Sequence, residues 1–351
     1  MMTLLGAGLV LGCGFGVAAG LGDFCLLRGL RQARDRHTDA RALRAWALAL
    51  AVAIAATQGL AWLQQIEPAR AQVVRSGFAL PAVLAGGALF GFGMVLARSC
   101  GARALVLLAG GNLRALVVLV SLGLAAQATL TGILAPLRQA LQGFGQVQLA
   151  AATLPEQLLL AGVGTTPATL LAALPPIAAL LWFALRHPGL RRAPREALAA
   201  ALIGGLVALG WWISTHVEVD PFDPAAPTSL SFIGPVAESF LYLQLAVGRA
   251  PGLGPAIVLG TLAGAGGVAL ATKSFRLTGF DSPERLLASM AGGCLMGFGG
   301  VLAVGCSIGQ GLSGLSTLAL ASLPACLGIV LGCLVGLRAE NSIHSLRGNT
   351  P

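Results

Sequence analysis

Charged residues are scarce in this chain. Only 10% of its 351 residues are Asp, Glu, Lys or Arg, whereas soluble domains carry about 25%. The sequence also has a single tyrosine, and its four histidines are dispersed. This composition excludes a soluble domain of any size, and we expect neither a nucleic-acid partner nor an organic cofactor. The seven cysteines include no CxxC pair and no Cys/His cluster, which argues against a disulfide framework and against a metal site.

Apolar residues and glycine take the place of the missing charge. Hydrophobic residues make up 56% of the chain and 49 residues are glycine, and small residues let helices approach closely in lipid. The apolar runs are close to the ~20 residues that cross a bilayer. They predict an all-α polytopic membrane protein embedded in the lipid bilayer. Its nine expected spans are roughly 4–22, 46–63, 78–97, 113–133, 168–185, 197–213, 253–272, 287–304 and 316–336.

Arginine positions predict how these spans are oriented. The net charge is +9, and Lys and Arg concentrate in cytoplasmic loops of membrane proteins. Basic residues gather in 28–44, 186–195, 273–285 and the tail after 337, whereas 216–227 has acidic residues and no Lys or Arg. Placing every basic group in the cytoplasm fits nine spans, with the N-terminus outside and the C-terminus inside.

A fifteen-residue phrase occurs twice. Residues 86–100 read GGALFGFGMVLARSC, residues 292–306 read GGCLMGFGGVLAVGC, and 10 of the 15 positions are identical at an offset of 206. The predicted topology sends the two copies across the membrane in opposite directions. Oppositely directed repeats with interrupted helices are typical of transporters, whose substrate sites lie at the breaks. We therefore expect two inverted halves, 1–195 and 196–351.

Short segments after the first and sixth spans extend this pairing. Residues 22–30 are too short to cross a membrane, and 231–247 are interrupted by Gly234 and Pro235. Both segments are short and broken, and 231–247 is expected to be re-entrant, because irregular backbone at membrane depth requires protein around it. Residues 148–160 are a second candidate.

Three cysteines coincide with the breaks. Cys25 follows the first span, and Cys100 and Cys306 end the two copies of the phrase. Helix N-termini favour anions, and a thiol adds a soft, polarisable contact suited to sulfane sulfur, selenium or Cu(I). We expect these cysteines to carry the substrate, with Gly101, Ser307 and Gln310 as secondary positions on the path. The remaining four are expected to pack as small apolar residues: Cys13, Cys294, Cys326 and Cys333.

The phrases GDFCLLRGL, GGALFGFGMVLARSCGAR and MGFGGVLAVGCSIGQGLSG together resemble the YeeE/YedE family of bacterial sulfur-transport proteins. The resemblance covers both halves. It implies an hourglass-shaped inner-membrane protein that passes thiosulfate or a similar sulfur anion inward along cysteines matching Cys25, Cys100 and Cys306. It also implies a cytoplasmic partner, a small sulfurtransferase resembling TusA. One departure is Arg98-Ser99 before Cys100, where the second copy has Val304-Gly305.

Three other functions remain open at this point. Some members of the family are linked with selenium compounds, which the residues do not distinguish from sulfur anions. A membrane thiol enzyme acting on sulfur–sulfur bonds would want a resolving cysteine or a basic residue that lowers a thiol pKa. A soft-metal permease would want runs rich in Met, Cys and His, and five methionines and four histidines do not form them. A transporter, not an enzyme, is the favoured interpretation.

Overall fold

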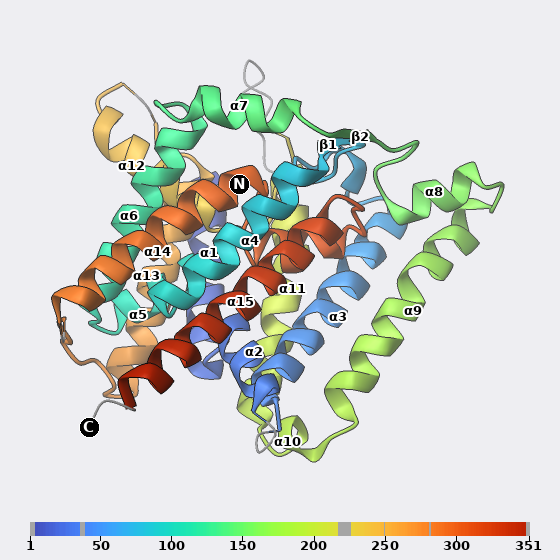
Figure 1. The fold of residues 1–351 in the computed structure, drawn as a ribbon. Coiled ribbons are helices and arrows are strands. Elements are labelled where there is room, and N and C mark those ends of the chain that lie inside the picture. Colours follow the sequence, from blue (N-terminus) through green and yellow to red (C-terminus); the bar gives the residue numbers. More distant parts are fainter. Residues whose placement is uncertain (1–3, 36–38, 217–225, 249, 281, 349–351) are drawn as a thin grey trace.

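Nine long helices dominate the computed structural model, which describes residues 4–35, 39–216, 226–248, 250–280 and 282–348 (Figure 1). Within these ranges nine helical stretches are long and apolar enough to cross a membrane, which confirms the predicted all-α polytopic fold. Their long helices are α1 (Leu4–Gly22), α3 (Arg41–Trp62), α4 (Leu80–Ala97), α6 (Leu113–Leu130), α9 (Thr165–Leu185), α11 (Pro194–His216), α13 (Leu253–Ala271), α14 (Pro283–Leu302) and α15 (Ser322–Gly348). Arg36 and most of the acidic loop 216–227 lie outside the described residues.

Short helices follow several of the spans. They are α2 (Leu26–Arg34), α5 (Gly101–Ala109), α12 (Ile233–Leu245) and the π-helix η2 (Gly309–Gly314). None approaches the ~20 residues of a span. The residues between α1 and α2, between α4 and α5 and between α14 and η2 are non-helical, and most of them are buried. Protein therefore surrounds these breaks, as the membrane interior requires.

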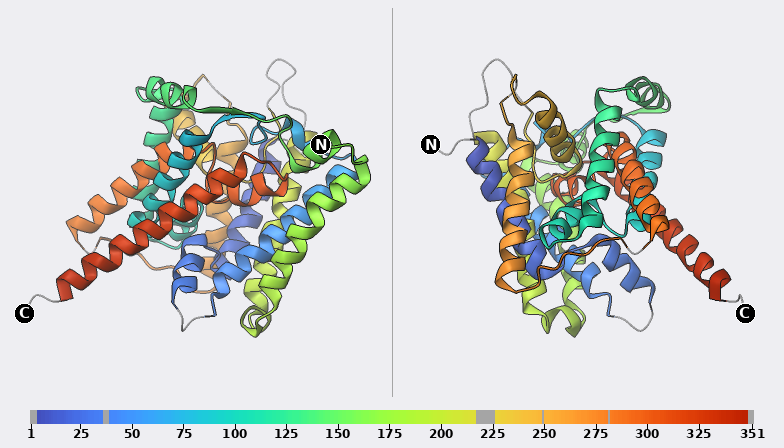
Figure 2. Two further views of the ribbon diagram at one scale, coloured as in Figure 1. Left: turned by 45° about the vertical axis from the view of Figure 1, so that its right-hand side comes forward. Right: turned by 90° about the vertical axis from the view of Figure 1, so that its left-hand side faces the viewer.

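The molecule has two distinct ends (Figures 1 and 2). The end called here the α7 face carries α7 (Ala135–Gly143), α8 (Leu154–Leu160) and η1 (Pro68–Arg70). A small antiparallel sheet of β1 (Gly77–Ala79) and β2 (Gln146–Gln148) lies there too, with Phe78 opposite Val147. The opposite end, the α10 face, carries α10 (Pro188–Arg191) and the C-terminal ends of α2 and α15.

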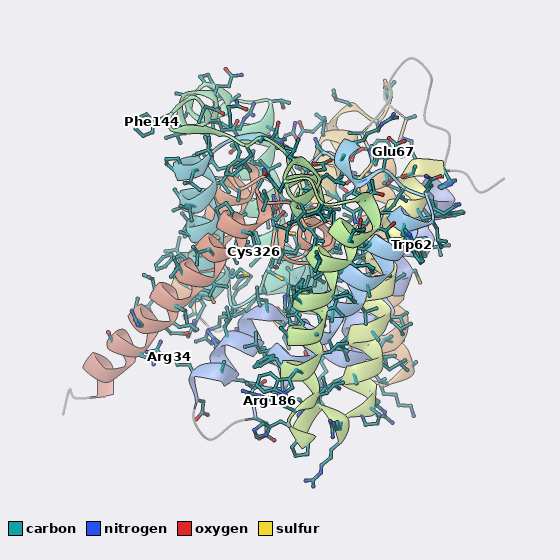
Figure 3. All side chains as sticks on the ribbon, turned by 90° about the vertical axis from the view of Figure 1, so that its right-hand side faces the viewer. Arg34, Trp62, Glu67, Phe144, Arg186 and Cys326 are labelled. Carbon is teal, nitrogen blue, oxygen red and sulfur yellow. The ribbon has the colours of Figure 1, made fainter. Side chains whose placement is uncertain are left out.

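Apolar side chains remain exposed along the outer helices. Leu171 of α9, Leu198 of α11 and Leu259 of α13 are about 60% exposed, between 59% and 63%. Such a surface would be unfavourable in water, whereas lipid tails cover it without cost. By contrast, Figure 3 shows Arg34 and Arg186 near the α10 face and Glu67 near the α7 face.

Helices α4 and α14 cross through the repeated phrase. A Cβ on Gly86 would lie 2.7 Å from the carbonyl oxygen of Gly299, and one on Gly93 would lie 2.7 Å from that of Gly292. These glycines are equivalent at the offset of 206, so the same two positions of the phrase meet at both ends of the crossing. The crossing is antiparallel, and glycine lets the two backbones touch.

The outer sides of the two copies also pack alike. Gly87 and Gly91 of α4 face the backbone of α15, and the equivalent Gly293 and Gly297 of α14 face the backbone of α6. Equivalent glycines of the two copies therefore pack against one neighbouring helix each, α15 beside α4 and α6 beside α14. The repeat is visible in the packing as well as in the sequence.

One predicted re-entrant segment has a different structure. Residues 148–160 leave β2 and form α8, none of whose residues is buried. Helix α8 lies at the end of α9 on the α7 face (Figure 1). Its start is a capping box in which Thr153 and Glu156 satisfy each other's backbone N–H groups, a common signal of a helix N-terminus.

Candidate functional site

Cys25 and Cys100 each begin a short helix, and Cys306 opens the turn that leads into η2, whose N-cap is Ile308. Cys25 is the N-cap of α2 and Cys100 is the N-cap of α5. Their carbonyl oxygens accept from the N–H groups of Gly29 and Ala104, at 3.1 and 2.8 Å. The carbonyl oxygen of Cys306 accepts in the same way from Gln310, at 2.8 Å. Each thiol thus sits where unsatisfied N–H groups of a helix start concentrate partial positive charge.

The backbone before each cysteine is also alike. The residue two positions earlier has a positive φ in all three cases: 48° at Asp23, 55° at Arg98 and 58° at Val304. Left-handed backbone is uncommon for any non-glycine residue and most unfavourable for a β-branched one such as valine. Strained backbone of this kind gathers at functional sites, where surrounding structure holds it. In all three places this turn follows the end of a long helix and leads the backbone to the cysteine.

The three thiols lie in one buried cluster. Cys25, Cys100 and Cys306 are 9%, 5% and 2% exposed and belong to the same hydrophobic core. The Cys100 thiol lies close to both Cys25 and Cys306. The structure brings together all three cysteines that the sequence selected.

Residues on either side of Cys306 line a cavity that opens on the α7 face. Its Sγ accepts from the N–H of Gly309, with 3.3 Å between the two atoms. A Cβ on Gly309 would lie 2.8 Å from Oγ of Ser231 and 3.7 Å from Sγ of Cys306. Gly305, Gly309 and Ser231 line the cavity, whose volume is about 370 Å³. Cys306 is thus the member of the group nearest to this opening.

Ser307 supplies a buried hydroxyl beside the Cys100 thiol. Its side chain is 1% exposed, and its Oγ has no nitrogen or oxygen partner among the described residues. The Cys100 thiol is within reach of this hydroxyl. A thiol is a weak hydrogen-bond partner, so the hydroxyl is suited to a ligand. The sequence had marked this position as secondary.

The two other secondary positions play different parts. Gly101 is the first residue of α5, and a Cβ there would lie 3.2 Å from a methyl carbon of Leu122. Gln310 donates from Nε2 to the carbonyl oxygens of Ala303 and Val304 and accepts at Oε1 from Ser322. Its amide ties the end of α14 and the start of α15 to η2. Gln310 therefore supports the turn that carries Cys306.

Ion pairs surround the side of the site that faces the α10 end. Asp23, two residues before Cys25, pairs with both Arg28 and Arg103. Glu196 bonds to Arg28 and Arg41, and Glu340 bonds to Arg31 and Arg98. A smaller cavity of about 150 Å³ lies nearby, lined partly by three arginines: Arg98, Arg114 and Arg285. Arginine side chains therefore outnumber acidic ones between the buried thiols and the α10 face.

The remaining cysteines lie inside long helices, and of these Cys333 is near one of the breaks. Cys13 is partly exposed in α1, Cys294 is exposed on α14 and Cys326 is partly exposed in α15. Cys333 is buried in α15 and interacts electrostatically with Cys25. No group of His, Cys, Asp or Glu suited to a metal ion occurs in the part of the chain that the structure describes.

Comparison with known proteins gives one family and two named relatives. The family described as sulphur transport matches residues 21–335. The thiosulfate transporter TsuA of Escherichia coli (strain K12) is 26% identical over 330 residues, which are 89% of this chain and 88% of that protein. The thiosulfate transporter TsuA of Spirochaeta thermophila is 27% identical over 341 residues, 94% of this chain and 97% of that protein.

Proposed function

The chain belongs to the sulphur transport family, and from this premise we propose that it takes up thiosulfate by way of its three buried cysteines. The family description and the names of both relatives indicate a transporter rather than an enzyme. The proposal rests on one observation above all: Cys25, Cys100 and Cys306 are buried near one another, each two residues after a left-handed residue, and each carbonyl oxygen accepts from the N–H four residues later.

Thiosulfate suits these groups because it is a dianion with a terminal sulfur. Short-helix N–H groups attract the charge, and each neutral S–H group is a weak donor that does not repel it. The soft terminal sulfur contacts a polarisable thiol better than a hard oxyanion does. Weak contacts repeated along a path allow an ion both to bind and to leave.

The order of contacts follows from the positions of the thiols. Cys306 bonds to Gly309, which lines the α7-face cavity, Cys100 lies close to both other thiols, and Cys25 lies near Asp23 and its arginine partners. The anion would meet Cys306, Cys100 and Cys25 in that order. Ser307 would donate its free hydroxyl to the anion as it passes Cys100.

We further propose that the chain consists of two inverted halves, 1–195 and 196–351. The reciprocal contacts of Gly86 with Gly299 and of Gly93 with Gly292 support a two-fold relation across the α4–α14 crossing. Helix α9 is then the span of the first half that has no counterpart in the second. Because it adds a fifth crossing, the second half starts on the opposite side of the membrane. An hourglass outline, with an opening on each side of the buried thiols, stays a prediction.

The proposed orientation places the α10 face in the bacterial cytoplasm and the N-terminus outside. The described arginines of 28–44 and 186–195 lie toward the α10 face, and cytoplasmic loops are enriched in arginine. Single cysteines introduced at Arg191 and at Gln64 test it in intact cells. A membrane-impermeant maleimide should label the Gln64→Cys variant alone, and labelling of Arg191→Cys alone would reverse the direction.

A cytoplasmic TusA-like sulfurtransferase is the partner we propose for the α10 face. Thiosulfate leaving Cys25 would emerge among arginines, and removal of its sulfur there would keep uptake moving inward. Uptake measured in cells with and without the sulfurtransferase tests this partner. Equal uptake in both would remove it from the account.

Uptake by the purified protein tests the function itself. The whole chain is reconstituted in liposomes, and accumulation of sulfur-labelled thiosulfate is compared with that in empty liposomes. We expect thiosulfate to enter only with the protein present and labelled sulfate not to enter. Equal accumulation in both preparations, or equal passage of sulfate, would contradict a thiosulfate transporter.

A further inference from the structure

The α7-face cavity contains two arginines that the path through the thiols does not use. Its charged lining residues are Arg75, in the loop before β1, and Arg138, in α7. The pairing of β1 with β2 brings these segments together, although they are distant in the sequence. Neither arginine forms an ion pair with an acidic residue among those described.

Backbone and amide groups hold the two side chains without neutralising them. Arg75 donates from Nε to the carbonyl oxygen of Gln72 at 3.2 Å. Arg138 donates to the carbonyl oxygens of Thr129 and Leu130 and to the side chain of Gln142. These bonds fix the Arg138 fork at the rim, and they leave the terminal nitrogens of Arg75 without a partner among the described residues.

The two positive charges lie close enough to affect each other. Partial desolvation in the cavity, and then the charge of Arg138, lower the pKa of Arg75 from its ordinary value, although the residue is exposed. A guanidinium stays protonated at neutral pH despite such a shift, so the cavity mouth carries two like charges. An anion between them would relieve this repulsion, and arginine forks match oxyanions in geometry.

The cavity connects this arginine pair with the first thiol. The same space is lined by Ser231, Gly305 and Gly309, and the N–H of Gly309 bonds to Sγ of Cys306. An anion held at the mouth therefore shares a cavity with the residues on either side of Cys306. Like charge in a cleft of low dielectric also raises the local concentration of an anion.

We propose that Arg75 and Arg138 form a binding site for divalent sulfur oxyanions at the outer mouth of the path. The site deepens the proposed function and rests on it. Because guanidinium groups recognise charge and oxygen atoms, the site would hold sulfate as well as thiosulfate. Selection would then occur in two steps: the arginines admit a divalent oxyanion, and the thiols pass only one with a terminal sulfur.

Kinetics of uptake by Arg75 variants in liposomes test the site. In Arg75→Gln the KM for thiosulfate should rise about tenfold, the factor that corresponds to about 1.4 kcal/mol, with the maximal rate unchanged. Arg75→Lys keeps the charge and should stay near the unmodified KM. The matched control is Arg70→Gln on the same face, since Arg70 pairs with Glu67 and does not line the cavity.

Sulfate supplies the second readout. It should inhibit thiosulfate uptake competitively in the unmodified protein and in Arg70→Gln, and far less in Arg75→Gln. A KM in Arg75→Gln equal to that of Arg70→Gln, or unchanged inhibition by sulfate, would overturn the site. If Arg75→Gln does not fold, an Arg75→Lys protein that sulfate inhibits no better than other salts would overturn it as well.

Binding without transport separates this proposal from the proposed function. Purified Cys100→Ser protein should still bind labelled thiosulfate at the mouth, and sulfate should displace it, although uptake is lost. Binding abolished in Cys100→Ser would contradict a separate outer site. Full uptake by Cys100→Ser would contradict the thiol path. The arginine site would then be decided by the KM and the sulfate inhibition of the Arg75 variants alone.

Discussion

The hydroxyl of Ser307 lies beside the thiol of Cys100 and has no nitrogen or oxygen partner among the described residues. Ser307 follows Cys306 directly, so one turn of chain presents both a thiol and a hydroxyl toward the middle cysteine. Protein interiors rarely keep such a polar atom unpaired. Its natural partner is the anion that the account places there.

Replacing Ser307 by alanine separates a ligand role from a structural one. We expect Ser307→Ala to slow thiosulfate uptake, because a donor to the passing anion is lost. The free energy of unfolding should be unchanged or should rise by up to about 1 kcal/mol, since an unsatisfied buried group is removed. Uptake in liposomes and thermal unfolding in detergent measure the two effects.

The matched control is Ser313→Ala, which removes a hydroxyl that donates to the carbonyl oxygen of Leu230 at 2.6 Å. This change should lower stability by about 1–3 kcal/mol, because it leaves the carbonyl oxygen without that donor. The account of Ser307 is wrong if Ser307→Ala loses stability as Ser313→Ala does and keeps its uptake.

Gln310 should act on Cys306 through the backbone. In Gln310→Ala the carbonyl oxygens of Ala303 and Val304 lose their donor, at a cost of about 1–3 kcal/mol for each buried group left unsatisfied. The strained turn before Cys306 should then relax and expose the thiol. We expect slower uptake together with faster alkylation of Cys306 by a maleimide. Slower uptake with unchanged alkylation would instead place Gln310 in contact with the substrate.

The α4–α14 crossing should tolerate no side chain on Gly93. A Cβ there would lie 2.7 Å from the carbonyl oxygen of Gly292, and overpacking of this kind costs about 1–3 kcal/mol. We expect Gly93→Ala to lower the melting temperature and the yield of inserted protein. Gly59→Ala in α3 is the control, because nothing lies within 4 Å of its added Cβ. Equal melting temperatures would show that the two backbones do not need to touch.

The spans were predictable because a bilayer imposes a minimum length on an apolar run. The breaks at Cys25, Cys100 and Cys306 were predictable because glycines and small residues interrupt those runs. The left-handed backbone at Val304 was not, since no local preference favours valine there and only tertiary packing holds it.

The arginine pair at the mouth also escaped prediction. Arg75 and Arg138 lie in surface segments with no shared motif, and only the β1–β2 pairing brings them together. Similarly, the glycines of the repeated phrase predicted close packing, and their partners across the α4–α14 crossing emerged only from the structure. Ser307 could be marked by its place after Cys306, whereas its unpaired hydroxyl is a property of the fold.

The central claim is that sulfur atoms form the path, and one substitution tests it most directly. Cys100→Ser keeps a small hydroxyl donor at the middle position and removes the polarisable atom. Cys294→Ser makes the same change at a cysteine exposed on the outside of α14. Uptake of labelled thiosulfate into liposomes should fall to the level of empty liposomes in Cys100→Ser and stay at the unmodified rate in Cys294→Ser. Uptake by Cys100→Ser at the unmodified rate would contradict the account.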